Sequence, residues 1–351
     1  MKQPETYWGY IRYKKLFLLF TAGIVALTAL WAVSAGSAGL SLQEVVATLL
    51  GYGSKQSSII IFNHRLPRVV TAIVAGIGLA TVGCAMQSLL KNPLASASTL
   101  GIAQGAAFGA SFAIIVLGAG MQKQTLDAIT IINPYVISIC AFASSMLSTL
   151  IVLGLSYFRQ VTPESMILAG VALSSMFAGA TTLMQYFAAD VKVAAVIFWT
   201  FGDLGRTGWH EIMMMTVIVT VAFIYYAFNR WNFNALQGGE ETAKGLGVNV
   251  TGFRLVGMLI GSLTASTIVS FIGIVNFIGL IAPHLVRRVI GNDYRYLLPA
   301  SALMGALLMV ASDTAARLAV APIILPIGAI TSFLGAPLFL YLVFKGVGGR
   351  K

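Results

Sequence analysis

Long apolar runs dominate this sequence, and their length is the feature that most constrains the fold. An α-helix needs about 20 mostly apolar residues to cross the hydrocarbon core of a bilayer. Glycine, proline and charged residues divide the runs into ten candidate spans. The predicted spans are residues 16–36, 67–89, 98–119, 132–156, 165–187, 210–229, 252–271, 274–290, 297–318 and 326–344. The segments 41–51 and 191–206 are expected to lie outside the bilayer or at its interface.

The composition agrees with an all-α protein embedded in a membrane. Hydrophobic residues make up 58% of the 351 residues and charged residues only 9%, whereas a soluble domain carries about 25% charged residues. So few charges cannot cover a water-facing surface of this size, which excludes a soluble enzyme, a secreted disulfide scaffold and a disordered chain. We therefore expect one polytopic domain over residues 1–351 with about ten transmembrane helices.

The distribution of Lys and Arg predicts which side of the membrane each loop faces. With ten spans and the N-terminus inside, fifteen of the 22 basic residues fall on the cytoplasmic side, and this bias predicts two cytoplasmic termini. The basic residues are scattered rather than gathered in a patch, which argues against nucleic-acid binding. The first run is long enough to remain as an uncleaved helix. Seven basic residues fall outside and need another explanation: Lys55, Arg65, Arg68, Lys123, Lys192, Arg206 and Arg317.

No residue pattern in the sequence supplies an energy source or a catalytic centre. The Gly-x4-Gly-Lys-Ser/Thr phosphate loop is absent, and the segment 238–245 lacks its spacing. Asp313 is the clearest acidic residue within a span, whereas ion-coupled carriers usually need more. Cys84 and Cys140 lie in apolar runs, which favours small buried thiols over a disulfide or a metal site. We expect no cofactor in this chain, and an energy source in another protein.

The segment Arg65-Leu66-Pro67-Arg68 lies at the outer end of the second span. Pro67 suits the start of a helix, but two arginines on this side run against the positive-inside trend. Guanidinium groups pair with carboxylates in a bidentate manner. The pair therefore favours binding of lipid headgroups or of carboxylates on a partner protein.

The inside loop 230–251 contains a short helix-forming stretch, Glu240 to Lys244, with glycines on both sides. A short helix across the cytoplasmic face is a docking element through which another protein could move the membrane-spanning helices. A plain solvated loop fits the spacing equally well. Further along, His284 follows Pro283 at a helix break, which favours a hydrogen-bonded structural histidine over a ligand.

The order of these and further motifs resembles the permease subunit of the ATP-binding-cassette (ABC) importers for vitamin B12, iron-siderophores and haem. The match covers nearly the whole chain from about residue 60 onward. The matching motifs are Arg65-Leu-Pro-Arg68, Gly83-x3-Gln87-x4-Asn92-Pro-Leu-Ala95, Leu100-Gly101-x3-Gly105-Ala106, Leu168-Ala-Gly170, Trp199-x2-Gly202, Gly239-Glu240 with Leu246-Gly247, Phe277-Ile-Gly-Leu-Ile-Ala-Pro-His284, Asp313-x3-Arg317, and Pro326-x-Gly328 with Gly335-Ala-Pro337.

This resemblance implies a type II ABC importer permease fold, with ten helices in each chain of a homodimer, or sometimes of a pseudo-symmetric pair with a sister chain, around a central path. Two P-loop ATPase subunits, which carry the ATP and Mg²⁺, would dock on the cytoplasmic side. A substrate-binding protein would dock on the opposite side and deliver a metal chelate such as an iron-siderophore, haem or cobalamin. The chain itself would be a transport subunit of the cell membrane and not an enzyme.

The resemblance also implies roles for individual residues. Arg65, Arg68 and Arg317 match positions that receive carboxylates of the binding protein. The fifth and tenth spans would line the path, with a cytoplasmic gate at Thr162, Pro163, Glu164 and Ser165. The residues that match the ATPase-coupling helices are Gly239, Glu240, Thr242, Ala243, Leu246 and Gly247.

Three positions depart from the family's pattern. Ile324 stands where the family commonly has Glu, Asp203 stands where it usually has Ser, and Pro163-Glu164 replaces small hydroxyl residues in the gate. Two other classes of function remain open. The scarcity of acidic residues weighs against a secondary transporter driven by an ion gradient. The short docking helix predicted on the cytoplasmic side weighs against a purely structural membrane subunit.

Overall fold

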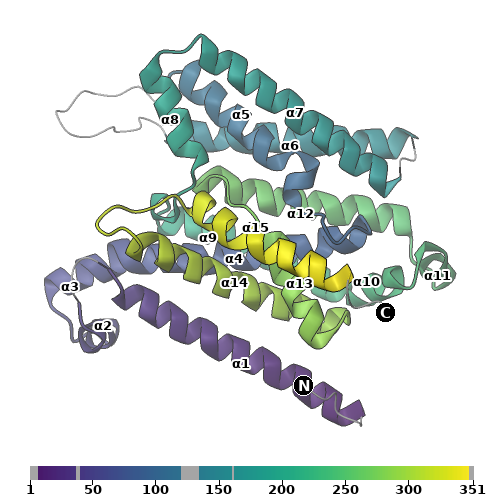
Figure 1. Ribbon diagram of the computed structural model, residues 1–351, viewed down its shortest axis with the longest axis horizontal. Helices are drawn as coiled ribbons and strands as arrows, with labels where there is room; N and C mark the ends of the chain where they lie inside the picture. Colours follow the sequence, from purple (N-terminus) through teal and green to yellow (C-terminus); the bar gives the residue numbers. More distant parts are fainter. Residues whose placement is uncertain (1–6, 37–39, 120–133, 160–161, 348–351) are drawn as a thin grey trace.

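The fold is entirely helical in the part of the chain that the computed structural model describes, residues 7–36, 40–119, 134–159 and 162–347. Ten helices match the ten predicted spans one for one (Figure 1). They are α1 (Tyr7–Ser34), α4 (Leu66–Leu89), α5 (Ile102–Ile115), α6 (Pro134–Arg159), α7 (Pro163–Tyr186), α9 (Trp209–Phe228), α12 (Val250–Ile272), α13 (Ile278–Ile290), α14 (Tyr294–Leu318) and α15 (Ile327–Val347).

Shorter helices occupy the connections between these ten. Residues 41–51 and 191–206, which the sequence placed outside the membrane core, contain α2 (Leu42–Leu49), most of α8 (Asp190–Thr200) and the 3-10 turn η3 (Leu204–Arg206). The loop 230–251 contains two short helices, α10 (Arg230–Gln237) and α11 (Glu240–Gly245). The remaining short elements are α3 (Lys55–Ile60), the π-helical turn η1 (Ile61–Arg65) and the 3-10 turn η2 (Ala97–Leu100).

Among the described residues, seven helices are long and apolar enough to cross a membrane, whereas α5, α13 and the Ile327–Tyr341 part of α15 are shorter. The 13 residues of α13 rise about 20 Å at 1.5 Å per residue, less than the roughly 30 Å hydrocarbon core. The predicted span 274–290 therefore overestimates the helix. Gly273 ends α12, and residues 274–277 are not helical. Gly261 and Gly279 lie inside α12 and α13 and do not interrupt them.

The helices pack around α4, most of which is buried. Figure 1 shows α5, α6 and α7 as one layer, separated from α1 by the layer that contains α4, α9 and α12 to α15. α4 and α14 approach each other closely, and a Cβ added at Gly76 would lie only 2.4 Å from the carbonyl oxygen of Gly305. Glycine allows this approach, and in lipid such close packing holds helices together.

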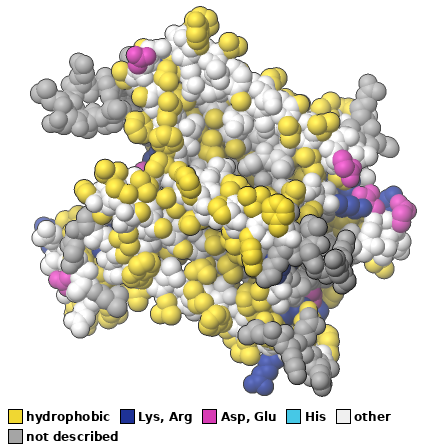
Figure 2. Space-filling model, viewed as in Figure 1, with side chains coloured by type: hydrophobic (Ala, Val, Ile, Leu, Met, Phe, Trp, Pro, Cys, Tyr) yellow, Lys and Arg dark blue, Asp and Glu magenta, His cyan; other side chains and the backbone are white. Residues whose placement is uncertain are grey.

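The two ends of the bundle differ in character. Figure 1 places the start of α1, the end of α15 and the helices α10 and α11 at one end, with α2 and α3 at the other. Between the ends, large apolar side chains are exposed on the flanks, among them Leu19, Leu27, Leu183 and Phe333. In Figure 2 hydrophobic side chains cover the middle of the visible face, and charged side chains gather around α10 and α11. A belt of this kind is stable only where lipid or protein covers it.

Candidate functional site

The three predicted docking arginines come together at the end of the bundle that carries α2 and α3. Because α4 and α14 are antiparallel and touch at Gly76 and Gly305, Arg68 near the start of α4 meets the last turns of α14. Arg65, Arg68 and Arg317 line one cavity of about 450 Å³. Asp203 and Ile324, two of the positions that depart from the family's pattern, line the same cavity.

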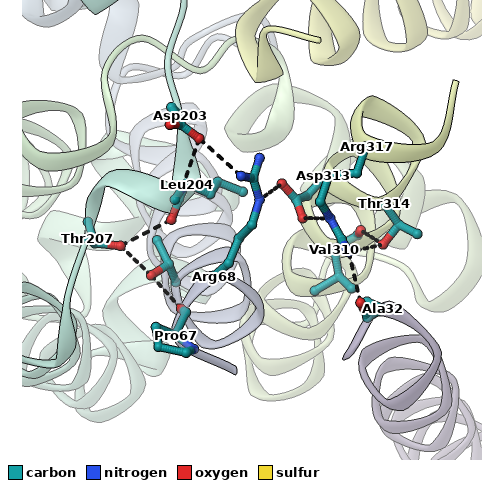
Figure 3. Close-up of polar contacts among 12 residues, drawn as sticks. Ala32, Pro67, Arg68, Asp203, Leu204, Thr207, Val310, Asp313, Thr314 and Arg317 are labelled. Carbon is teal, nitrogen blue, oxygen red and sulfur yellow. Dashed lines mark hydrogen bonds and ion pairs between the residues drawn. The ribbon is translucent and has the colours of Figure 1, made fainter. Parts of the chain in front are cut away.

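A buried carboxylate, Asp313, holds two of these arginines (Figure 3). Its side chain is 1% exposed, and its two oxygens accept hydrogen bonds from Nε of Arg68 at 2.8 Å and Nε of Arg317 at 2.9 Å. A carboxylate in a membrane-spanning helix is costly unless it is paired. Two guanidiniums provide that pairing, which explains the one acidic residue that the sequence places clearly within a span.

The remaining donors of Arg317 and one donor of Arg65 contact the C-terminal end of α1. Arg317 donates from Nη1 to the carbonyl of Ala35 at 2.7 Å and from Nη2 to that of Ala32 at 2.9 Å. Arg65 donates from Nη1 to Val33 and Ser34, at 2.9 and 2.8 Å. The last carbonyls of a helix lack partners within the helix and carry partial negative charge. The two arginines therefore fasten the end of α1 to α14 and η1.

Arg68 has a second, exposed partner in Asp203. Its Nη1 lies 3.3 Å from Oδ1 of Asp203, whose side chain is 45% exposed. The backbone N–H of Gly205 donates to the same oxygen at 2.9 Å, which fixes the carboxylate at the start of η3. In Figure 3 Arg68 lies between Asp203 on one side and Asp313 on the other. One side of Arg68 is thus paired with a buried carboxylate, and the other faces the cavity.

At the opposite end of the bundle, the short helix predicted in the loop 230–251 is α11. Ion pairs of its first residue, Glu240, attach it to the bundle. Gly239 precedes α11 with φ of 114°, a conformation that favours glycine. Glu240 then pairs with Lys91, at the end of α4, at 3.1 Å and with Arg254, in the first turns of α12. Burial opposes ionisation of Glu240, but the hydrogen bonds from Lys91 and Arg254 outweigh it and lower the pKa of this carboxyl group.

The other predicted coupling residues divide into buried and exposed positions. Ala243 is fully buried beneath α11. Thr242, Leu246 and Gly247 are exposed, with 69% of Leu246 accessible. An apolar side chain so exposed at a helix end is a surface that a second protein could cover. Lys91 and Arg254 anchor α11. In the sequence they counted only among the basic residues that indicate the cytoplasmic side, so their anchoring role was not predicted.

The predicted gate residues form the start of α7. The helix begins at Pro163, two residues before the predicted span, and the Thr162 hydroxyl accepts a hydrogen bond from the N–H of Ser165 at 3.4 Å. Threonine as a helix cap followed by proline is a favoured combination. Glu164 and Ser165 are exposed, at the end of the bundle that carries α11 (Figure 1).

His284 is the remaining position that the sequence singled out for its chemistry. The ring of His284 is half-buried and meets Phe339 edge-on, with 6.4 Å between ring centres. Within the described ranges, no group of three or more His, Cys, Asp or Glu side chains is placed to hold a metal ion. The chemistry available at both ends is therefore ion pairing and hydrogen bonding.

Comparison with known proteins identifies the family. Residues 24–345 match the FecCD transport family. A putative ABC transporter permease protein of Methanocaldococcus jannaschii is 49% identical over 98% of this chain and 99% of its own. A hemin transport system permease protein of Yersinia pestis is 33% identical over 94% of this chain and 96% of its own. A cobalamin import system permease protein of Halobacterium salinarum is 34% identical over 89% and 80%.

Solved structures agree with these relatives. A putative metal-chelate type ABC transporter in an inward-facing conformation superposes with a TM-score of 0.82 and 27% identity, covering 93% of this chain and 98% of its own. The resemblance to ABC importer permeases is thus confirmed, as is the prediction of a transport component rather than an enzyme. The chain belongs to the FecCD transport family.

Proposed function

We propose that the chain is the membrane-spanning subunit of an importer that takes up a metal chelate, such as an iron-siderophore, haem or cobalamin. A substrate-binding protein delivers the cargo at the arginine-lined cavity, and two ATPase subunits act at α10 and α11. The observation that carries the proposal is the position of these two polar surfaces at opposite ends of an apolar bundle. This arrangement suits a path that is loaded from one side and driven from the other.

The proposed orientation places α10, α11 and both termini in the cytoplasm of a cell-membrane protein. The start of α1 and the end of α15 lie at the α10–α11 end, which supports this orientation. Residues 1–6 and 348–351, which carry several of the basic residues counted as cytoplasmic, lie outside the described part of the chain. The arginine-lined cavity then faces away from the cytoplasm.

A displacement of α11 would be transmitted to the membrane-spanning helices through Glu240. This carboxylate joins α11 both to the end of α4, through Lys91, and to the start of α12, through Arg254. An ATPase that holds Thr242, Leu246 and Gly247 would therefore displace two central helices together with α11. ATP and Mg²⁺ bind to the ATPase subunits in this proposal, and the permease contributes no cofactor.

A second copy of the chain completes the path in this proposal. α7 buries few of its residues within one copy, and α15 exposes Phe333, Leu334 and Phe344. These two helices correspond to the predicted path-lining spans, and apolar faces of this size need a cover. The start of α7, at Thr162 to Ser165, would form the cytoplasmic gate between the two copies. An apolar wall lets a bulky chelate pass without a deep binding well.

A secondary transporter driven by an ion gradient fits the described residues less well. Such a carrier needs an acidic side chain that gains and loses its ion during transport. Asp313 is buried between two arginines, and each of its two carboxylate oxygens already accepts a hydrogen bond from one of them. The main candidate for an ion-binding residue is thus already occupied within the chain.

Purification of the tagged full-length chain in mild detergent from its own cells tests the proposal. We expect a P-loop ATPase to co-purify with the permease at a one-to-one ratio. A preparation that retains its helical content but carries no ATPase under any salt condition would contradict the proposal. Nucleotide-independent uptake driven by an ion gradient would favour the secondary transporter instead.

A further inference from the structure

A second polar cavity lies beside the α10–α11 segment. It encloses about 540 Å³ between the end of α4, α10 and the end of α13. Its polar lining comes from Gln87, Ser88, Lys91, Gln237, Arg287 and Asn292. Within the described ranges no Asp or Glu lines it, so the two charged groups in the wall are both cations.

Arg287 of α13 is held in this wall by Gln87 of α4. Its Nη1 donates a hydrogen bond to Oε1 of Gln87. Gln87 is 3% exposed, and its Nε2 donates to the carbonyl of Leu280, about two helix turns before Arg287 in α13, at 3.2 Å. The buried amide therefore fixes the guanidinium at the cavity, but as a neutral acceptor it leaves the charge of Arg287 unbalanced.

Three other buried or half-buried arginines provide a contrast, whereas the half-buried Arg65 donates to backbone carbonyls. Arg68 and Arg317 share Asp313, and Arg254 pairs with Glu240. Lys91, the second cation in the wall of this cavity, is also balanced by Glu240. Arg287 forms no ion pair with any carboxylate in the part of the chain that the structure describes. A half-buried guanidinium favours a carboxylate partner that can accept two of its parallel N–H donors.

We infer that this cavity receives an Asp or Glu side chain of the ATPase subunit when that subunit covers α11. The inference rests on the proposed function. Gln237, which donates to the carbonyl of Asn292 at 3.0 Å, and Gly239 form the rim next to α11. A protein that covers Leu246 and Thr242 would therefore also reach the opening of the cavity. Its carboxylate would supply the charge that Arg287 lacks.

The binding of purified ATPase to the detergent-solubilised permease, measured over a salt titration, tests the inference. Loss of a charge-assisted hydrogen bond removes about 1.5–3 kcal/mol, so Arg287→Gln is expected to weaken binding by about tenfold or more and to reduce its salt dependence. Arg288→Gln, the neighbouring exposed position on α13, serves as the matched control and should bind like the wild type.

A second variant gives the same test without removing a half-buried side chain. Gln237→Glu places a carboxylate at the exposed rim, where it competes with the partner's carboxylate for Arg287. We expect weaker ATPase binding for Gln237→Glu, and wild-type binding for Gln237→Ala. Wild-type affinity and salt dependence for both Arg287→Gln and Gln237→Glu would overturn the inference and leave the proposed function standing.

Native mass spectrometry of the same preparations tests an anionic phospholipid as the occupant. If Arg287→Gln loses a bound anionic lipid and keeps full ATPase affinity, the cavity holds a headgroup and the inference is wrong. If the wild-type permease itself binds no ATPase, the proposed function fails together with the inference. These outcomes are distinguishable. In the first, the variant loses bound lipid but keeps its affinity for the ATPase, and in the second the wild-type permease itself does not bind the ATPase.

Discussion

Asp203 faces Arg68 across the mouth of the arginine-lined cavity, with Oδ1 of the carboxylate 3.3 Å from Nη1 of the guanidinium. The other side of Arg68 is bound to Asp313, which is buried. Arg68 therefore has one partner that is fixed within the helices and one that solvent or another protein can replace. In the proposed importer, a carboxylate of the binding protein would have to displace Asp203 before it could pair with Arg68.

Replacement of Asp203 by the serine that the family usually has at this position should tighten docking of the binding protein. An exposed ion pair contributes about 0.2–1 kcal/mol, so removal of the competing carboxylate should raise affinity by up to about fivefold. Binding of the loaded binding protein to permease in detergent is the measurement. Asp190→Ser, an exposed acid at the start of α8, is the control. Weaker docking by Asp203→Ser would contradict the competition.

Asp313→Asn should destabilise the folded permease strongly. The change leaves Arg68 and Arg317 beside a neutral amide, and removal of one partner of a buried ion pair costs about 3–5 kcal/mol. The midpoint of chemical or thermal unfolding in detergent should fall accordingly, whereas Asp190→Asn should leave it unchanged. A variant as stable as the wild type would show that the Asp313 pairs contribute little.

Arg317→Lys should loosen the end of α1 although it keeps the positive charge. The guanidinium reaches Asp313, Ala35 and Ala32 with three separate nitrogens, a geometry that one ammonium group cannot reproduce. Hydrogen exchange of the backbone amides in residues 30–36 should become faster, while amides in the middle of α1 keep their protection. Unchanged exchange at residues 30–36 would mean that Arg317 does not fasten α1.

Attachment of α11 should weaken in acid. Glu240 has a pKa below its usual value in the folded protein, so its pairs with Lys91 and Arg254 contribute fully above the pKa of the unfolded chain. That contribution is lost as the pH falls through the lowered folded pKa. Hydrogen exchange of α11, corrected for the intrinsic pH dependence, should rise over this acidic range.

Two variants distinguish this effect from general acid unfolding. Glu240→Gln should exchange rapidly in α11 at every pH, because the amide cannot form the two ion pairs. Glu241→Gln, whose side chain is 89% exposed in the wild type, should keep the pH dependence. A similar pH response in Glu240→Gln and the wild type would refute the role of Glu240.

The sequence predicted the ten helices well because the length of an apolar run is a local property. The predicted helix boundaries are less accurate where tertiary contacts determine where a helix begins or ends. The first helix begins at Tyr7, nine residues before the predicted start, because Lys14 does not interrupt it. Lys14 is buried over the ring of Tyr10, with its Nζ 4.2 Å from the ring centre and 4.0 Å from Asp293.

The sequence could predict which residues belong to the candidate sites, but not which groups they contact. The resemblance marked Arg65, Arg68 and Arg317, and the structure brings them to one cavity. Their acceptors could not be predicted, because the backbone carbonyls at the end of α1 have no signature in the sequence. The role of Asp203 likewise depends on the packing of η3 against the start of α4. The sequence marked it only as a departure from a family pattern.

Uptake by sealed vesicles that contain the permease and its ATPases tests whether ATP and the binding protein drive transport through this chain. The loaded binding protein is added on the side of the arginine-lined cavity, and ATP is enclosed on the side of α11. With ionophores that collapse proton and sodium gradients, we expect chelate uptake that requires both ATP and the binding protein. Uptake that proceeds without nucleotide and stops when the gradients collapse would contradict it.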